Sequence, residues 1–132
     1  MPWIACLASQ AQVTPLFSAS SKAQGAPFDL VAVETERHPT KSYLAVDGFH
    51  ERTAPGSRWL MCAYAALAMQ RGFSNYFVVY PAQGSIRVVV AAANSPDASP
   101  SALLGLDFAK ENALGDAMMP VQKMAAFCGF KR

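Results

Sequence analysis

A continuous run from Ser57 to Tyr80 constrains the fold of this chain more than any other part of its sequence. Ser57 can accept a hydrogen bond from the free amides of a first helical turn, and Gly72 can adopt the left-handed conformation that ends a helix. Residues 59–69 between them are apolar without a break. Residues 75–81 follow and are rich in strand-forming side chains. The run therefore predicts one core helix that leads directly into one buried strand.

Small side chains on this helix predict that it packs closely on a sheet. One face of this helix is expected to carry only small side chains, those of Ala65, Ala66 and Ala68. Larger side chains such as Trp59 and Leu67 fill the space around them. We therefore expect the three alanines to face the sheet.

Two pairs of strand-like segments flank the helix. Before it, residues 28–36 and 42–49 are separated by a short polar stretch that contains Pro39. After it, residues 75–81 and 85–93 are joined by a three-residue connection whose Gly84 suits a hairpin. The sequence predicts an α+β fold in which an antiparallel sheet of about four strands, in ββαββ order, packs on the core helix.

The two ends of the chain differ in character. Residues 1–27 include a stretch rich in Ser, Ala and Gln without apolar periodicity, which predicts a signal remnant or a flexible tether. Residues 102–112 predict a weak helix. A second helix is predicted over 117–128, capped by Asp116 and ended by Gly129. We therefore assign residues 28–132 to a single α+β domain.

Composition excludes several classes of protein. The chain has 132 residues, of which 52% are hydrophobic and 15% charged, which suits one folded domain. Its net charge is +2, and its longest basic run is the Lys131-Arg132 pair, so the electrostatic footprint of a nucleic-acid-binding protein is missing. The longest apolar run has eleven residues, whereas a membrane-spanning helix needs about twenty.

The first residues allow two kinds of export signal. Ser9-Gln10-Ala11 has the small-x-small form of a signal-peptidase site, and Ile4-Ala5-Cys6 resembles a lipoprotein processing site in which Cys6 is lipidated. Either one predicts a location in the periplasm or cell envelope. The alternative is that Met1 is the true start of a cytoplasmic protein and that this segment is a short apolar arm.

The cysteines bear on the same choice. If Cys6 is removed or lipidated, Cys62 and Cys128 remain as a pair suited to a disulfide in an oxidising compartment. The alternative is two buried free thiols. The chain contains no CxxC or HxxxH spacing, so we assign no metal ligands and no cofactor.

Candidate catalytic residues are few. His50 neighbours Glu51 and follows Asp47 by three residues, so it offers a general base for a small hydrolase, with a serine or Cys62 as nucleophile. His38 lies next to Pro39 in a polar connection. However, the sequence has no GxSxG elbow, and Cys62 lies in an apolar helix where its thiolate is disfavoured. We therefore assign no catalytic residues.

Residues 86–90 predict a strand that is apolar on both faces, with Arg87 as its single charge. Such a strand is either covered on both sides or used at an interface. If it lies at a sheet edge, it favours a homodimer formed by pairing with a second copy.

The core pattern also resembles that of a group of small, mostly uncharacterised proteobacterial envelope lipoproteins. Nine residues carry the resemblance, in a strand, a helix and the next strand: Tyr43, Gly48, Ala65, Ala66, Gly72, Tyr76, Phe77, Val78 and Val79. The resemblance covers about forty residues and implies an α+β envelope domain without an established enzymatic activity. We therefore expect a non-catalytic, envelope-associated structural or binding protein. The alternative is a cytosolic small domain that acts through homodimerisation or partner binding.

Overall fold

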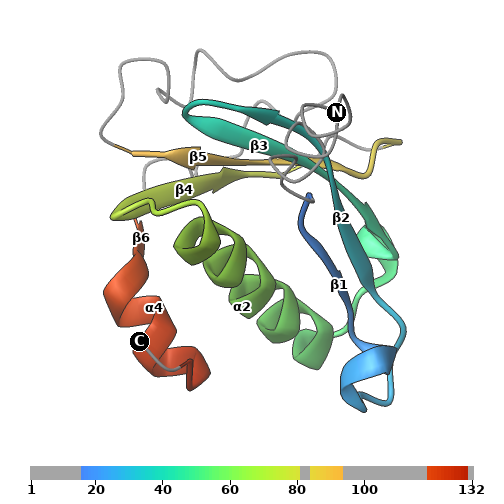
Figure 1. Ribbon diagram of the computed structural model, residues 1–132. Coiled ribbons are helices and arrows are strands. Elements are labelled where there is room, and N and C mark those ends of the chain that lie inside the picture. The colour runs from blue at the N-terminus through green and yellow to red at the C-terminus, as the bar shows by residue number, and fades with distance from the viewer. Residues whose placement is uncertain (1–15, 81–83, 94–118, 131–132) are drawn as a thin grey trace, which may run out of the picture.

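The computed structural model describes residues 16–80, 84–93 and 119–130, which form an α+β fold with one curled antiparallel sheet (Figure 1). The strands are β1 (Ser18–Ser20), β2 (Val31–His38), β3 (Lys41–Asp47), β4 (Asn75–Val79), β5 (Arg87–Ala92) and β6 (Met119–Pro120). The helices are the short 3-10 turns η1 (Lys22–Gln24) and η2 (Phe49–Glu51) and the α-helices α2 (Ala54–Gln70) and α4 (Val121–Cys128).

The strands lie in the order β1-β2-β3-β5-β4-β6, and all neighbours are antiparallel. The α+β class predicted from the sequence is therefore confirmed. The four expected strands correspond to β2, β3, β4 and β5, but in the described residues the sheet has six strands and a βββαβββα element order. The two additional strands lie at the sheet edges and are only three and two residues long, too short to produce a detectable alternation in sequence.

The sheet begins upstream of the boundary that we expected at Phe28. Ser18 pairs with Val33 and Ser20 with Val31, so part of the predicted tether is the edge strand β1. The fully buried Ser21 fixes the following turn, because its hydroxyl donates to the Phe28 carbonyl and accepts from the Leu30 amide, both at 2.7 Å. The small side chains of residues 18–20 did not predict a strand, because β1 is held by backbone pairing with β2.

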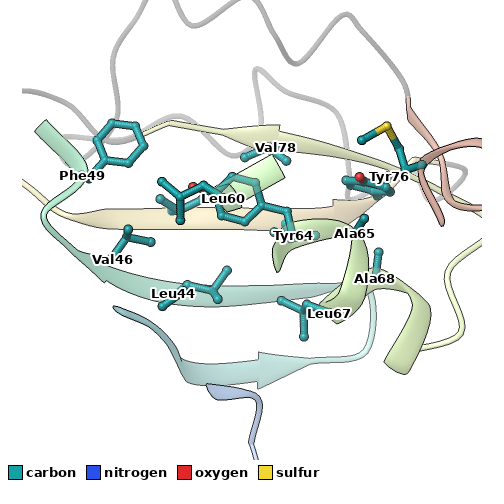
Figure 2. Close-up of a cluster of buried hydrophobic side chains, with 14 of the residues drawn as sticks. Leu44, Val46, Phe49, Leu60, Tyr64, Ala65, Leu67, Ala68, Tyr76 and Val78 are labelled. Carbon is teal, nitrogen blue, oxygen red and sulfur yellow. The ribbon is translucent and has the colours of Figure 1, made fainter. Parts of the chain in front are cut away.

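The core lies between α2 and the concave face of the sheet. Leu44 and Val46 of β3 point toward Leu60 and Leu67 of α2, and all four side chains are buried (Figure 2). Ala68 is fully buried in the same cluster, as expected for a helix that approaches a sheet closely. The other face of the sheet also holds a buried apolar cluster, which consists of Phe77, Val79, Val89 and Ala91.

Both helix starts differ from the prediction. Helix α2 begins one turn before Ser57, because the Thr53 hydroxyl accepts from the Gly56 amide at 3.3 Å and caps it. Helix α4 begins at Val121, not at 117, because Met119 and Pro120 pair with β4 instead. Proline lacks an amide hydrogen, so it is tolerated in an edge strand. The predicted cap Asp116 and the predicted helix over 102–112 lie outside the described residues.

The strand β5 lies at the centre of the sheet. It is hydrogen-bonded to β3 on one side and to β4 on the other, and residues 88–92 are all buried. Burial therefore explains the apolar run from Val88 onward, whereas Ile86, which precedes the strand, is 38% exposed. Strand pairing occupies one side of β5 at residues 87–91 and the other side at residues 89–92, which agrees with the first of the two alternatives given for this run, a strand covered on both sides. The homodimer was expected only if the strand lay at a sheet edge.

Candidate functional site: a groove walled by a disulfide

An open groove of about 520 Å³ lies between β1, α2 and the end of α4. Its volume is within the range of small-molecule and cofactor sites in proteins. Aromatic, alanine and cysteine side chains make up most of its wall. The lining residues are Phe17, Ser18 and Ala19 around β1, Gln24 of η1, Pro55, Arg58, Trp59, Cys62, Ala63 and Ala66 of α2, and Cys128 and Phe130 at the end of α4.

Local structure holds the aromatic side chains of the groove in place. The Trp59 indole packs partly against the core and donates from Nε1 to the Gln24 Oε1 atom at 2.9 Å, which joins α2 to η1. Gly129 ends α4 in the left-handed conformation, with φ at 76°, and the chain turns back so that the Phe130 amide donates to the Ala125 carbonyl at 2.8 Å. This turn places Phe130 in the groove wall.

The structure joins Cys62 of α2 to Cys128 of α4 by a disulfide, with Cα atoms 5.7 Å apart. These are the two cysteines that the sequence singled out as a pair. The bridge ties the end of the chain to the middle of the core helix, and both residues line the groove. Cys6, the candidate lipidation site, lies outside the described residues.

Ala66 also lies in the groove wall, where it is half-buried. The expectation that it faces the sheet with Ala65 and Ala68 is therefore wrong. Ala65 and Ala68 are 1% and 0% exposed and belong to the core cluster. A helix turns about 100° per residue, so Ala66 points in a different direction from its neighbour Ala65. The three alanines therefore cannot all share one narrow face.

Arg58 is the charged residue of the groove wall, and it is exposed. Within the described part of the chain, no carboxylate forms an ion pair with it. The groove therefore combines an apolar lining with one positive charge.

A buried carboxylate, Glu34, contacts the backbone of the groove residue Phe17 and was not anticipated from the sequence. Its side chain is fully buried. The carboxylate accepts from the Phe17 amide at 2.9 Å, from the Ser42 hydroxyl at 2.6 Å, and from Arg37 through Nε at 3.0 Å and Nη2 at 2.6 Å. It therefore joins the residue before β1 to β2 and β3.

A β-bulge makes this cluster possible. Residues three apart in a regular strand point to opposite faces, which would separate Glu34 from Arg37. The register of β2 shifts between Glu34 and Glu36, leaving one additional residue on β2, so both side chains lie on the same face. Leu30 and Ala32 are buried at alternate positions, and the same alternation makes Glu34 the next buried residue. This alternation is the feature of the sequence that could have predicted the burial of Glu34.

The ion pair and the hydrogen bonds determine the ionisation of Glu34. Burial alone acts to raise the pKa of the carboxyl, but the hydrogen bonds from Arg37, the Phe17 amide and Ser42, together with the Arg37 charge, outweigh it and lower the pKa from 4.5 to about 2. The group is therefore charged in the folded protein at neutral pH.

Arg71 connects this cluster to the end of α2. Its guanidinium donates to the Ser42 hydroxyl and to the His38 carbonyl, the latter at 2.6 Å, and lies 4.0 Å from the Glu34 carboxylate. Burial lowers the pKa of Arg71 from its ordinary value. The cluster therefore joins the groove residue Phe17 to β2, β3 and the end of α2. The Glu34 carboxylate thus accepts hydrogen bonds at both oxygens.

The two histidines lie apart from the groove. The His50 ring is 2.7 Å from the Ser85 carbonyl oxygen through Nε2 and packs edge-on against Phe49. His38 lies at the end of β2, where its Nε2 is 3.3 Å from Glu36 Oε1. Cys62, the candidate thiol nucleophile, is bound in the disulfide. The structure therefore does not bring His50 and Cys62 together as a catalytic pair.

A second cavity beneath α2 is much smaller, with a volume of about 10 Å³. Tyr64 borders it, and the buried Tyr64 hydroxyl has no hydrogen-bond partner among the described residues. Burial raises the pKa of Tyr64 above its ordinary value. A space of this size accommodates about one water molecule. The groove, not this cavity, is therefore the candidate ligand site.

None of the helices in the described ranges combines the length and hydropathy of a membrane span. The same residues contain no group of three His, Cys, Asp or Glu side chains placed to hold a metal ion. Comparison with models of known protein families, with curated proteins and with solved structures found no match to this chain.

Proposed function

We propose that this chain is a non-catalytic binding protein of the cell envelope, and that its groove holds apolar side chains of a partner polypeptide. The observation that carries the proposal is the apolar groove of about 520 Å³ between β1, α2 and the Cys62–Cys128 bridge. Fixed aromatic side chains and a covalent bridge give a preorganised surface, which lowers the entropic cost of binding.

Two features support the envelope as the location. Disulfides persist in oxidising compartments and are rare in the cytosol, and here a disulfide forms part of the candidate site. The resemblance of the core pattern to envelope lipoproteins points in the same direction. The cytosolic alternative requires the two cysteines to function as free thiols.

To test this proposal, a substitution fills the groove, and the affinity for an unfolded polypeptide is then measured. The probe is fluorescein-labelled, reduced and carboxymethylated α-lactalbumin, and fluorescence anisotropy reports its affinity. Ala66→Phe places an aromatic ring in the groove, so we expect at least tenfold weaker binding. The matched control, Ala126→Phe, adds the same ring at an exposed position of α4 that does not line the groove and should retain the affinity. Equal affinity of the two variants would contradict the proposal.

A further inference from the structure

We infer that the partner binds as an added β-strand along the open edge of β1, and this inference rests on the proposed function of the groove. β1 is the terminal strand of the sheet in the described fold, and it lies where the sheet curls beside α2 (Figure 1). Terminal strands present unpaired backbone groups that can pair with another chain.

The register identifies the backbone groups that face outward. The Glu34 amide donates to the Phe17 carbonyl and the Ser21 amide donates to the Leu30 carbonyl, both at 2.8 Å. In an antiparallel pair, successive residues direct their backbone groups alternately toward and away from the neighbouring strand. Residues 17, 19 and 21 therefore face β2, and the amide and carbonyl groups of Ser18 and Ser20 point to the open edge.

The open edge borders the groove, because Ser18 and Ala19 belong to its wall opposite Trp59 and Ala66. A polypeptide that pairs with Ser18 and Ser20 directs every second side chain toward α2, where the lining is apolar. Arg58 favours an acidic residue in such a segment. The chemistry that fits is an extended segment of alternating apolar residues with an acidic side chain near the groove.

A second copy of this chain fits less well. Its β1 carries only the small side chains of Ser18, Ala19 and Ser20, which leave an apolar groove of about 520 Å³ largely unfilled. A two-fold pairing of these edges would also repeat the positive charge of Arg58 without adding an acidic partner. The inference therefore commits to a different polypeptide.

The first test removes one outward amide. Proline lacks the N–H group and is tolerated in an edge strand where that group faces away from the sheet. We expect Ser18→Pro to bind the labelled unfolded α-lactalbumin at least tenfold more weakly than Ser18→Ala, which keeps the amide and lacks the same hydroxyl. Similar affinities of the two variants, with Ala66→Phe still weakened, would overturn strand addition and leave the proposed function intact.

The second test needs no substitution and covers the case in which Ser18→Pro does not fold. We expect saturation with the unfolded probe to slow amide hydrogen exchange at Ser18 and Ser20 at least tenfold. Unchanged exchange at both amides in the saturated protein would overturn the inference.

A dimer that forms without the probe and protects the same amides would assign this edge to a second copy, and would also overturn the inference. No binding of the probe to the unmodified protein would overturn both the inference and the proposed function.

Discussion

At Glu34, one buried carboxylate holds together three strands and the end of a helix. Its hydrogen bonds to the Phe17 amide, Ser42 and Arg37 leave its oxygens satisfied. Removing one partner of a buried ion pair is costly because the remaining charge stays buried without compensation. Through the Phe17 amide, the same carboxylate also anchors one residue of the groove wall to the sheet.

We expect Glu34→Gln to change the pH dependence of stability. The pKa of Glu34 is lowered from 4.5 to about 2, so the ionised form stabilises the fold above about pH 4.5, and this contribution is lost as the pH falls toward 2. The shift corresponds to about 3 kcal/mol. Urea unfolding between pH 2.5 and 7 should show a loss of about that size at pH 7 and a flatter profile in the variant.

The control for this prediction is Glu36→Gln on the same strand. Glu36 is exposed, and its contacts with His38 and Arg87 lie at the surface, where such contacts contribute little to stability. A Glu34→Gln variant that kept the acid-dependent loss of stability of the unmodified protein would contradict the assigned role of the carboxylate.

The alanines of α2 give a second prediction at this scale. Ala68 is fully buried against the sheet, so Ala68→Leu overpacks the core and should lower the free energy of unfolding by about 1 to 3 kcal/mol. Ala66→Leu points into the groove and should cost less than Ala68→Leu. Denaturant unfolding of the two variants measures the difference. Equal losses would mean that both alanines contact the sheet.

At the scale of elements, α4 depends on its covalent connection. The helix has eight residues, which is too short to be stable by itself in water. Val121, Met124 and Ala125 are its buried residues, and the bridge from Cys128 to Cys62 closes a separation of 66 residues. In the chain-entropy model a bridge of this span stabilises the fold by about 4 kcal/mol.

We therefore expect Cys62→Ser with Cys128→Ser to lower the free energy of unfolding by about 4 kcal/mol. Cys6→Ser is included in all proteins of this comparison to prevent exchange of thiols. Chemical unfolding measures the loss, and amide exchange should be fastest in α4. A reductant should reproduce the loss in the parent protein and leave the double variant unchanged. A parent protein with the same stability in both redox states would show that packing alone holds α4.

At the scale of the whole molecule, the proposed envelope location predicts the chemical state of the mature chain. We expect protein expressed with its native upstream coding sequence to have a mass that begins at Gln12 or at a lipidated Cys6. We also expect Cys62 and Cys128 to resist alkylation until a reductant is added. Intact mass spectrometry measures both properties. A mass that begins at Met1 or Pro2, with three thiols open to alkylation, would support the cytosolic alternative.

Local signals in the sequence predicted the central elements well. The uninterrupted apolar run over 59–69 and the glycine at 72 marked the core helix and its end, and α2 ends at Gln70. Alternating or continuous apolar residues marked the four central strands. These features are visible in sequence because burial on one or both faces of an element imposes a short period on the side chains.

Features that depend on partners distant in the sequence were missed. The short strands β1 and β6 are held by backbone pairing with β2 and β4, and their side chains carry no periodic pattern. Glu34 is buried because Ser42 and Arg71 reach it from other elements. The open apolar groove was not predicted, because its wall combines residues from η1, β1, α2 and α4.

The α+β class, the core helix and the four central strands could be predicted from sequence, which also offered Cys62 and Cys128 as a pair while leaving two free thiols as the alternative. The position of β5 inside the sheet, the edge strand β1 and the apolar groove beside the bridge became visible only in the folded chain. This difference follows from the range of the interactions. Periodicity and capping act within a few residues, whereas sheet order and grooves arise from contacts between segments that are far apart along the chain.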